Sequence, residues 1–251
     1  MSFIVIIPAR YESTRLPGKP LKDIAGTTMI QRVWQQASKS GASRVIIATD
    51  DERIKQVASE FGAEVCMTRG DHVSGTDRLQ EVAQALGLND EQLVVNVQGD
   101  EPLIPPAVID QVAENLAVHA IAGVSTLSEP INDIEVFNDP NVVKVVVNAA
   151  GMANYFSRAS IPWPRGNIQV ESGVIQSEQS PRRHIGIYAY RVSQLNAFVG
   201  WAVAPTEQAE ALEQLRFLWN GVAIHVADAV EKVPGGIDTE KDLEAISTLF
   251  K

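Results

Sequence analysis

The sequence predicts an α/β protein built on an open, mostly parallel, Rossmann-like sheet with helices on both faces. Short apolar runs alternate with amphipathic helical patterns over roughly the first half of the chain, and the connections between them are short. The first run, FIVIIP, is apolar throughout, which is typical of a parallel strand buried on both faces. These two observations favour a sheet that is covered on both sides.

The elements of this first half follow one another in a regular order. The stretch MIQRVWQQASKSG places Met29, Ile30, Val33 and Ala37 on one helical face and stops at Gly41, a residue suited to the position just beyond a helix. A proline opens the helix expected in PPAVIDQVAENLA, where its missing amide is tolerated. The expected strands lie at 3–8, 44–49, 63–68 and 93–98, and the expected helices lie at 29–41, 51–62, 74–87 and 105–117.

The pattern changes after about residue 120. The runs VVKVVV and HIGIYAY are expected strands, and the irregular stretch 151–183 between them is expected to form loops and a hairpin that extend the sheet and cover one side. Within it, residues 166–181 are expected to be mobile. A helix near 206–220, the strand AIHVAD and a final helix after GGIDTEKDL complete one domain, 1–251, in which about 125–200 form a small sheet extension or lid.

Composition and charge narrow the class of protein. The chain has 251 residues and a formal net charge of −10, which argues against nucleic acid as the main partner, because duplex binding depends on Lys and Arg. The single cysteine, Cys66, excludes an internal disulfide. No run approaches the roughly 18 apolar residues of a membrane span, and no signal-peptide pattern is present. We therefore expect a cytoplasmic protein without membrane insertion.

Three cations are gathered in the loop that follows the first strand, IPARYESTRLPGKP. Arg10, Arg15 and Lys19 share this loop with two hydroxyl side chains, and they stand on an otherwise acidic protein. The loop matches neither the phosphate-binding pattern GxxxxGK[ST] nor the dinucleotide pattern GxGxxG. Guanidinium forks, an ammonium and hydroxyls at a strand end are nevertheless suited to a polyphosphate. The alternative, three solvated surface cations, is less favoured because all three lie in one loop.

Two aspartates follow expected strands or turns beside glycine. Asp100 stands in QGDEP and Asp238 stands in GGIDT. Mg²⁺ binds one or two carboxylates and takes its remaining ligands from water and substrate phosphates, so the pair fits a metal site next to a triphosphate. Asp238 is not needed as a helix cap, because Thr239 with Asp242 three residues later resembles a capping box.

The stretch HVSGTDR has two equally weighted interpretations. Ser74 or Thr76 caps the following helix, or Ser74, Gly75 and Arg78 contact a base or a phosphate at its N-terminus. The four histidines are widely separated and form no metal-binding pair. His184 differs from the others because it opens the expected strand HIGIYAY, directly after two arginines.

Taken together, these motifs resemble one known family. The stretches IIPARYESTRLPGKPL, ATDD, HVSGTDR, NVQGDEP, YFSRASIP, HIGIYAYR, LEQLR and GIDTEKDLE occur in the order found in CMP-KDO synthetases, the 3-deoxy-manno-octulosonate cytidylyltransferases. The matches run from residue 3 to about residue 244. Glucose-type nucleotidylyltransferases are less similar, because their opening loop is rich in glycine. Between Arg165 and Arg182 the sequence departs from the family pattern, so contacts from that segment are not transferred.

The resemblance implies a fold, a reaction and an assembly. The family has the nucleotide-diphospho-sugar transferase type of sheet, depends on Mg²⁺ and forms homodimers. It couples CTP with the eight-carbon sugar acid KDO, giving CMP-KDO and pyrophosphate for lipopolysaccharide synthesis. Residues of about 125–200 would then carry the sugar-acid site and the dimerisation surface. No side chain is singled out as a general base.

The resemblance also assigns roles to individual positions. Arg10, Lys19, Asp100 and Asp238 would be catalytic, with the two aspartates as metal ligands. The nucleotide-binding residues would be Ala9, Arg10, Arg15, Lys19, Ala48, Thr49, Asp50, Ser74, Gly75, Arg78 and Gln98. The sugar-acid residues would be Arg158, Arg165, His184, Tyr188, Glu210 and Gln214.

Other substrates and another class of protein remain to be weighed. An 8-amino KDO stays open, because one pocket residue is enough to read one substituent. A sialic acid is disfavoured by HIGIYAYR and YFSRASIP. A catalytically silent scaffold is disfavoured because Asp100 and Asp238 are both present.

Overall fold

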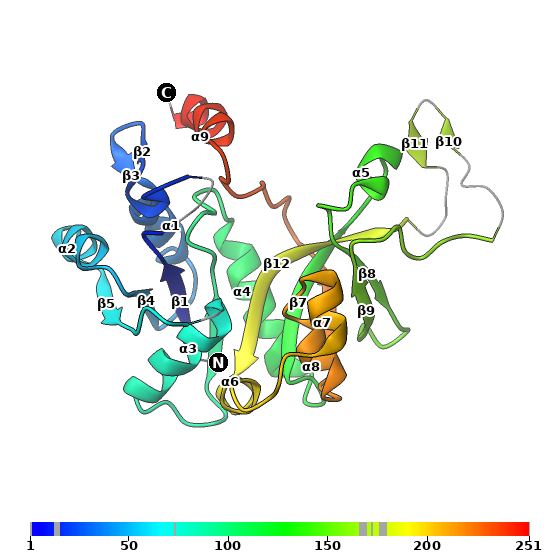
Figure 1. Cartoon of the computed structure of the whole chain (residues 1–251), viewed down its shortest axis with the longest axis horizontal. Coiled ribbons are helices and arrows are strands. Elements are labelled where there is room, and N and C mark those ends of the chain that lie inside the picture. Colours follow the sequence, from blue (N-terminus) through cyan, green and yellow to red (C-terminus); the bar gives the residue numbers. More distant parts are fainter. Residues whose placement is uncertain are drawn as a thin grey trace.

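One mixed, mostly parallel sheet organises the molecule (Figure 1). The structure is a computed structural model, and it describes residues 2–12, 16–72, 74–165, 170–171, 173–175 and 180–250. In this part of the chain nine strands join in the order β13-β7-β12-β6-β1-β4-β5, with β8 on β12 and β9 on β8. The strands are β1 (Phe3–Ala9), β4 (Arg44–Thr49), β5 (Glu64–Met67), β6 (Leu93–Asn96), β7 (Val124–Pro130), β8 (Lys144–Val147), β9 (Ala153–Ser157), β12 (Arg182–Arg191) and β13 (Ile224–Asp228).

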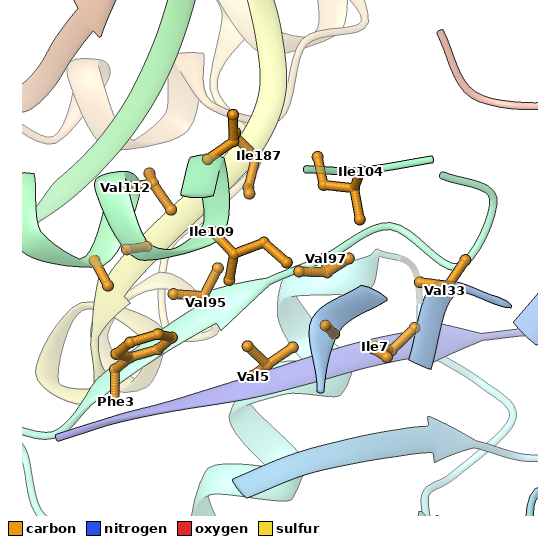
Figure 2. Packing of buried hydrophobic residues seen from close by; sticks show 14 of the residues in the cluster. Phe3, Val5, Ile7, Val33, Val95, Val97, Ile104, Ile109, Val112 and Ile187 are labelled. Carbon is orange, nitrogen blue, oxygen red and sulfur yellow. The ribbon is translucent and has the colours of Figure 1, made fainter. Parts of the chain in front are cut away.

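The central strand β1 is buried on both faces, as its apolar sequence predicts. It pairs in parallel with β4 and β6, and Ile6 lies opposite Ile46 and Asn96. Successive side chains of a strand point to opposite faces, so Val5 and Ile7 enter one core while Ile4 and Ile6 enter the other. Figure 2 shows the first of these cores. Because both faces of β1 are buried, polar residues occur only beyond the ends of this strand.

Helices cover both faces of the sheet. On one face α1 (Met29–Ala37) packs on β1 and β4, α2 (Glu52–Glu60) on β4 and β5, and α4 (Pro106–Val118) on β6, β7 and β12. Residues such as Val33, Ile109 and Val112 lie inside this layer (Figure 2). On the other face the core is closed by α3 (Gly75–Ala85), α6 (Val192–Phe198) and α8 (Leu215–Trp219). The expected fold class, an open sheet with helices on both faces, is therefore confirmed. None of the described helices is long and apolar enough to cross a membrane.

An antiparallel strand inside the sheet decides which residues reach its functional edge. β12 runs antiparallel to both of its neighbours, β6 and β7, whereas β1, β4, β5, β6, β7 and β13 are parallel. The start of β12 therefore lies at the edge where the parallel strands end. His184 pairs with Ser128 near the end of β7, and Tyr188 pairs with Asn96 at the end of β6.

Two features differ from the sequence expectation. The strand β7, which lies between β13 and β12, was not among the expected strands; its Ser125 and Thr126 are fully buried and donate to backbone carbonyls. The single helix expected near 206–220 is wrong. The chain forms α7 (Pro205–Glu210) and α8, separated at Ala211, whose φ of 50° lies in the left-handed region.

The extension beyond the main sheet contains the expected loops and hairpin. β8 and β9 enlarge the sheet, and β10 (Val170–Glu171) and β11 (Val174–Ile175) form a hairpin that stands apart beside α5 (Figure 1). Most of 166–181, expected to be mobile, lies outside the described residues. The small elements are η1 (Lys19–Leu21), β2 (Asp23–Ile24), β3 (Thr27–Thr28), α5 (Ile134–Asn138), α9 (Glu240–Ser247) and η2 (Thr248–Phe250).

Candidate active site

The loops after β1 and β6 come into direct contact at the carboxyl edge of the sheet. Gly99 makes this possible, because a Cβ added to it would lie 2.7 Å from the carbonyl oxygen of Pro8. The turn QGDEP therefore presses against the end of β1 at a point where only glycine fits. Ligands of open parallel sheets bind at this edge, so the two loops that the sequence singles out are brought to the expected place.

Lys19, Asp100 and Asp238 form one cluster at this edge. The Lys19 ammonium lies 2.8 Å from Asp100 Oδ2 and 3.0 Å from Asp238 Oδ1. Backbone contacts fix the cluster: Ile237 donates to the Asp100 carbonyl, and Gly18, with a φ of 68°, begins the short helix that carries Lys19. Three residues separated by up to 219 positions in sequence thus meet around one ammonium group.

The charges of this cluster match the chemistry expected of it. Burial lowers the pKa of Lys19, but hydrogen bonds and charges from Asp100 and Asp238 outweigh this and leave that pKa raised. Both carboxylates lie within hydrogen-bonding distance of the Lys19 ammonium. Within the described residues, no group of three or more His, Cys, Asp or Glu side chains could hold a metal ion without further ligands. Two carboxylates with room for phosphate and water ligands fit Mg²⁺.

A cavity of about 780 Å³ opens next to the first loop. Arg10, Asp50 and Asp51 line it, together with Arg53 from the first turn of α2. The Arg53 guanidinium stacks on the ring of Tyr11, 3.3 Å from its centroid, and pairs with Asp51. The wall of the cavity is therefore rich in charge of both signs. Arg15, expected in the same loop, lies outside the described residues.

Arg78 and Ser74 are held inside the protein by their own contacts. Arg78 is completely buried, and its guanidinium donates to Thr68 and, at 3.0 Å, to Asp50. Ser74 caps α3 in a reciprocal capping box with Asp77, which confirms the capping interpretation of HVSGTDR. Of these groups, Asp50 lines the cavity, so Arg78 can influence a ligand there through Asp50.

The remaining predicted nucleotide residues shape the floor of the edge. Ala9 and Ala48 are buried at the ends of β1 and β4. Thr49 is also buried, and its hydroxyl accepts a hydrogen bond from the Asp51 amide. Gln98 contacts the Gly186 carbonyl at 3.5 Å, which links the loop after β6 to β12. Gly75 is the first residue of α3.

Two of the predicted sugar-acid residues lie side by side on β12. The rings of His184 and Tyr188 are 5.3 Å apart, and Thr126 Oγ1 lies 3.0 Å from His184 Nε2. Burial and the nearby Arg183 charge lower the pKa of His184 to about 3, so the imidazole is neutral at physiological pH. Burial raises the pKa of Tyr188. This pair offers hydrogen-bonding groups without charge.

Two others, Arg158 and Glu210, contact each other through backbone groups. The Glu210 carboxylate accepts from the Ser157 hydroxyl at 2.6 Å and from the Arg158 amide at 2.9 Å. The Arg158 guanidinium donates to the carbonyls of Glu210 at 2.7 Å and Pro140 at 3.1 Å. Both side chains therefore hold the chain where it leaves β9. Of the other two, Arg165 is exposed, whereas Gln214 is buried at the start of α8.

Sequence reasoning passed over two buried charged residues near the site. Glu213 accepts a hydrogen bond from Thr76, and burial raises the pKa of its carboxyl. It stands in LEQLR, next to a residue that the resemblance did select. Lys144 interrupts the otherwise aliphatic strand VVKVVV, and that isolated charge was the signal available in the sequence.

The fold and the edge cluster define a nucleotidyltransferase. A cytidylyltransferase family model matches residues 4–225. The 3-deoxy-manno-octulosonate cytidylyltransferases of Cellvibrio japonicus (strain Ueda107) and Pseudomonas syringae pv. syringae (strain B728a) are 60% and 58% identical, and each alignment covers 100% of this chain and 99% or 98% of the relative. This chain belongs to the 3-deoxy-manno-octulosonate cytidylyltransferase family, as the sequence motifs predict.

Solved structures agree with this placement. A CMP:2-keto-3-deoxy-manno-octonic acid synthetase complexed with CTP superposes with a TM-score of 0.89 at 41% identity, over 99% of this chain and 98% of that one. A cytidylyltransferase from Leptospira borgpetersenii serovar Hardjo-bovis (strain JB197) superposes with a TM-score of 0.61 over 98% of this chain and 85% of that one. At 17% identity the second likeness concerns the fold alone.

Proposed function

We propose that this protein transfers CMP from CTP to the anomeric 2-hydroxyl of KDO, releasing pyrophosphate and activating the sugar acid for lipopolysaccharide assembly. The observation that carries the proposal is the convergence of Lys19, Asp100 and Asp238 at the carboxyl edge of the sheet, in a chain of this family. A scaffold without activity has no need for a lysine and two aspartates at one point of its ligand edge.

The opening loop holds the triphosphate. Both reactants are anions that repel each other, so bringing them together and neutralising their charge are the main catalytic tasks. Arg10 lines the cavity beside the loop, and Lys19, in the same loop, contacts the carboxylates of Asp100 and Asp238. Charge-assisted bonds from these two side chains to phosphate oxygens would offset the repulsion and leave the α-phosphorus open to attack.

Asp100 and Asp238 are the residues that would hold Mg²⁺. When bound, the ion would neutralise charge on the triphosphate and lower the pKa of a coordinated hydroxyl. Asp100 is held by its own backbone, because its carbonyl accepts from the Ile237 amide, next to Asp238. The chain thus orients both carboxylates toward the same point before any ligand enters.

The sugar acid would lie against β12 and the base of the extension. His184 and Tyr188 are neutral partners for sugar hydroxyls, and Glu210 and Gln214 lie on α7 and next to α8. A guanidinium binds a carboxylate with two parallel hydrogen bonds. Arg165 is the exposed candidate for this contact, whereas Arg158 already donates to backbone carbonyls and is the better support.

We further propose that the extension, within about 125–200, mediates a homodimer. Two apolar side chains support this: Trp163 is 64% exposed and Val174, on the hairpin, is 46% exposed. A dimer interface in this region would remove both side chains from water. Sedimentation of the protein and of a Trp163→Ser variant tests this; a wild-type monomer, or an unchanged dimer in the variant, would contradict it.

A coupled pyrophosphate-release assay tests the reaction. We expect the fastest release with CTP and KDO, and slower release with UTP, an 8-amino KDO or a sialic acid. Faster release with the 8-amino sugar would change the substrate within the same chemistry. No release with any sugar acid, in the presence of Mg²⁺ and CTP, would overturn the proposal.

A further inference from the structure

A completely buried lysine lies at the base of the extension. The exposed fraction of Lys144 is 0%, and its ammonium donates to three backbone carbonyls, those of Asp139 at 2.8 Å, Val142 at 2.5 Å and Arg158 at 2.7 Å. An ammonium has three N–H donors, and here each one has an acceptor. The lysine therefore ties the turn 139–142 to the end of β9 from inside the protein.

The charge of Lys144 is buried without a carboxylate in contact. None of the ion pairs found among the described residues includes it. Burial lowers the pKa of Lys144, which reflects the cost of removing an ammonium from water. The three carbonyls and the nearby charges of Asp139 and Glu210 offset part of that cost. An apolar side chain of the same size would leave all three carbonyls without this donor, so the position requires an amine.

The position of Lys144 in the sheet links both ends of the extension. On β8 it lies opposite Ser157 of β9 on one side and opposite Arg183 of β12 on the other. The chain leaves the sheet after β9, passes through Arg165 and the hairpin, and returns at β12. Lys144 thus stands between the point of departure and the point of return of the segment that carries Arg165.

Lys144 also completes the fixation of Arg158. The Arg158 amide donates to the Glu210 carboxylate, and its carbonyl accepts from Lys144, so both backbone polar groups of this residue are held. On the other side of β8, the His184 amide donates to the Val143 carbonyl at 2.8 Å. Through these contacts Lys144 is placed between Arg158 and His184, two residues assigned to the sugar acid.

We infer that Lys144 is a positioning residue for the sugar-acid substrate: together with Arg158 it fixes the base of the extension, so that Arg165 and His184 are presented to the crevice together. The inference rests on the proposed function, because it names what that pocket needs in order to bind KDO. Lys144 itself is completely buried, so its side chain is not available for direct contact with a substrate. Replacing Lys144 should therefore weaken KDO use and leave the two nucleotide loops, which follow β1 and β6, unchanged.

The variant Lys144→Met tests this, since it keeps the length of the side chain and removes the donors. We expect the KM for KDO to rise about 10- to 100-fold, the range expected when positioning is lost. The Kd for CTP, measured by calorimetry without sugar, should stay within about twofold, the scatter of independent sites. Lys144→Gln, which keeps two donors on a shorter side chain, should lie between Met and wild type.

A matched control separates positioning from lost stability. Leu116→Ala creates a cavity in the core near the C-terminal end of α4. It should lower the thermal stability without changing the Kd for CTP or the KM for KDO. An equal change of the CTP and KDO constants in Lys144→Met, or a KDO-specific loss in Leu116→Ala, would overturn the inference. If the Lys144 variants do not fold, hydrogen exchange in the wild-type protein decides. The amides of Arg158 and Ala159 should be as protected from exchange as the amide of Phe156. Rapid exchange of these two amides would contradict the fixation of the chain at the end of β9.

The wild-type assay keeps the two proposals apart. If the unmodified protein releases no pyrophosphate from CTP with KDO, the proposed function is wrong. If it does, and Lys144→Met uses KDO as well as wild type does, the reaction stands and the positioning role of Lys144 is wrong.

Discussion

The two sides of the crevice use charged residues in different ways. On the proposed nucleotide side, the Lys19 ammonium contacts the carboxylates of Asp100 and Asp238, so all three side chains meet at the carboxyl edge of the sheet. On the proposed sugar side, Arg158 and Lys144 donate to backbone carbonyls, and Glu210 accepts from the Arg158 amide and the Ser157 hydroxyl. This difference indicates two roles for charged residues near a site. Some lie at the edge where the ligand is proposed to bind, and others hold the backbone of the segments that would contact the ligand.

The sheet explains why the two sides differ. The nucleotide loops follow parallel strands, β1 and β6, which are rigid because both of their faces are buried. The extension is supported by β8, β9 and the start of β12, and by a small apolar cluster around Ile131, Phe137 and Ile175. A region with less core must be held by buried polar contacts, and each such contact is costly to break. Substitutions should therefore separate the two sides clearly.

The largest effect is expected for Asp100→Asn on the nucleotide side. The Asp100→Asn variant loses one of the two carboxylates that would hold a divalent ion. Its kcat should fall by about 10³-fold or more, because such an ion stabilises the transition state by several kcal/mol. The melting temperature should change little, since the side chain is outside the core. Steady-state kinetics at saturating Mg²⁺ measures this, with Asp110→Asn on the distant helix α4 as the control. Near-normal turnover would remove Asp100 from the metal site.

The next effect is expected for Lys19→Met. Each charge-assisted bond is worth about 1.5–3 kcal/mol, so kcat/KM for CTP should fall on the order of 10- to 100-fold. Unlike a surface lysine, Lys19 also keeps two carboxylates from repelling each other, so the melting temperature should fall. Lys22→Met is the matched control, because Lys22 is paired with Glu240 in a more exposed position. If both variants behave alike, Lys19 is a surface cation.

The sequence predicted the first of these sides better than the second. Asp100 and Lys19 stand at the end of an apolar strand and in the loop after another, and the strand-end rule is enough to place them together. Asp238 is distant in sequence and follows no predicted strand, so its pairing with Asp100 rested on residue type and the neighbouring glycines, and then on the family pattern. Asp100 and Lys19 both follow strands that the hydrophobic pattern predicts.

On the second side the pattern was not informative. β7 was not among the expected strands; its sequence contains the polar residues Ser125 and Thr126, whose hydroxyls donate to the carbonyls of Val112 in α4 and Ile187 in β12. The antiparallel direction of β12, which brings His184 to the ligand edge, depends on pairing that no local pattern encodes. Residue type alone also did not reveal that Arg158 donates to backbone carbonyls.

A smaller effect is expected for Arg158→Lys on the sugar side. The ammonium keeps the charge but cannot reach the carbonyls of Pro140 and Glu210 at once, so the exit from β9 loosens. The KM for KDO should rise about tenfold, and the melting temperature should fall by a few degrees. Kinetics with varied KDO at saturating CTP measures the first effect. An unchanged KM for KDO would show that this fixation does not matter for the sugar.

The smallest effect is expected at the opposite edge of the sheet, at His225. It stacks on His119 with ring centroids 3.7 Å apart, and burial and the His119 charge lower its pKa to about 4. A folded pKa below the unfolded value of about 6.5 means that only the unfolded chain gains a proton between these two values, so stability falls as pH drops from about 6.5 to about 4. Melting curves of His225→Gln should show a weaker decline over this range. An equally steep decline would contradict this, and neither substrate constant should change.

Calorimetric titration of CTP, in the absence of sugar, tests most directly whether the two sides are separate. Lys19→Met should weaken CTP binding by on the order of tenfold or more, because it removes a charge-assisted contact. Arg158→Lys and His184→Ala, which lower KDO use, should leave the Kd for CTP within about twofold of wild type. If the sugar-side variants weaken CTP binding as strongly as Lys19→Met does, the extension serves the nucleotide and the division of the crevice is wrong.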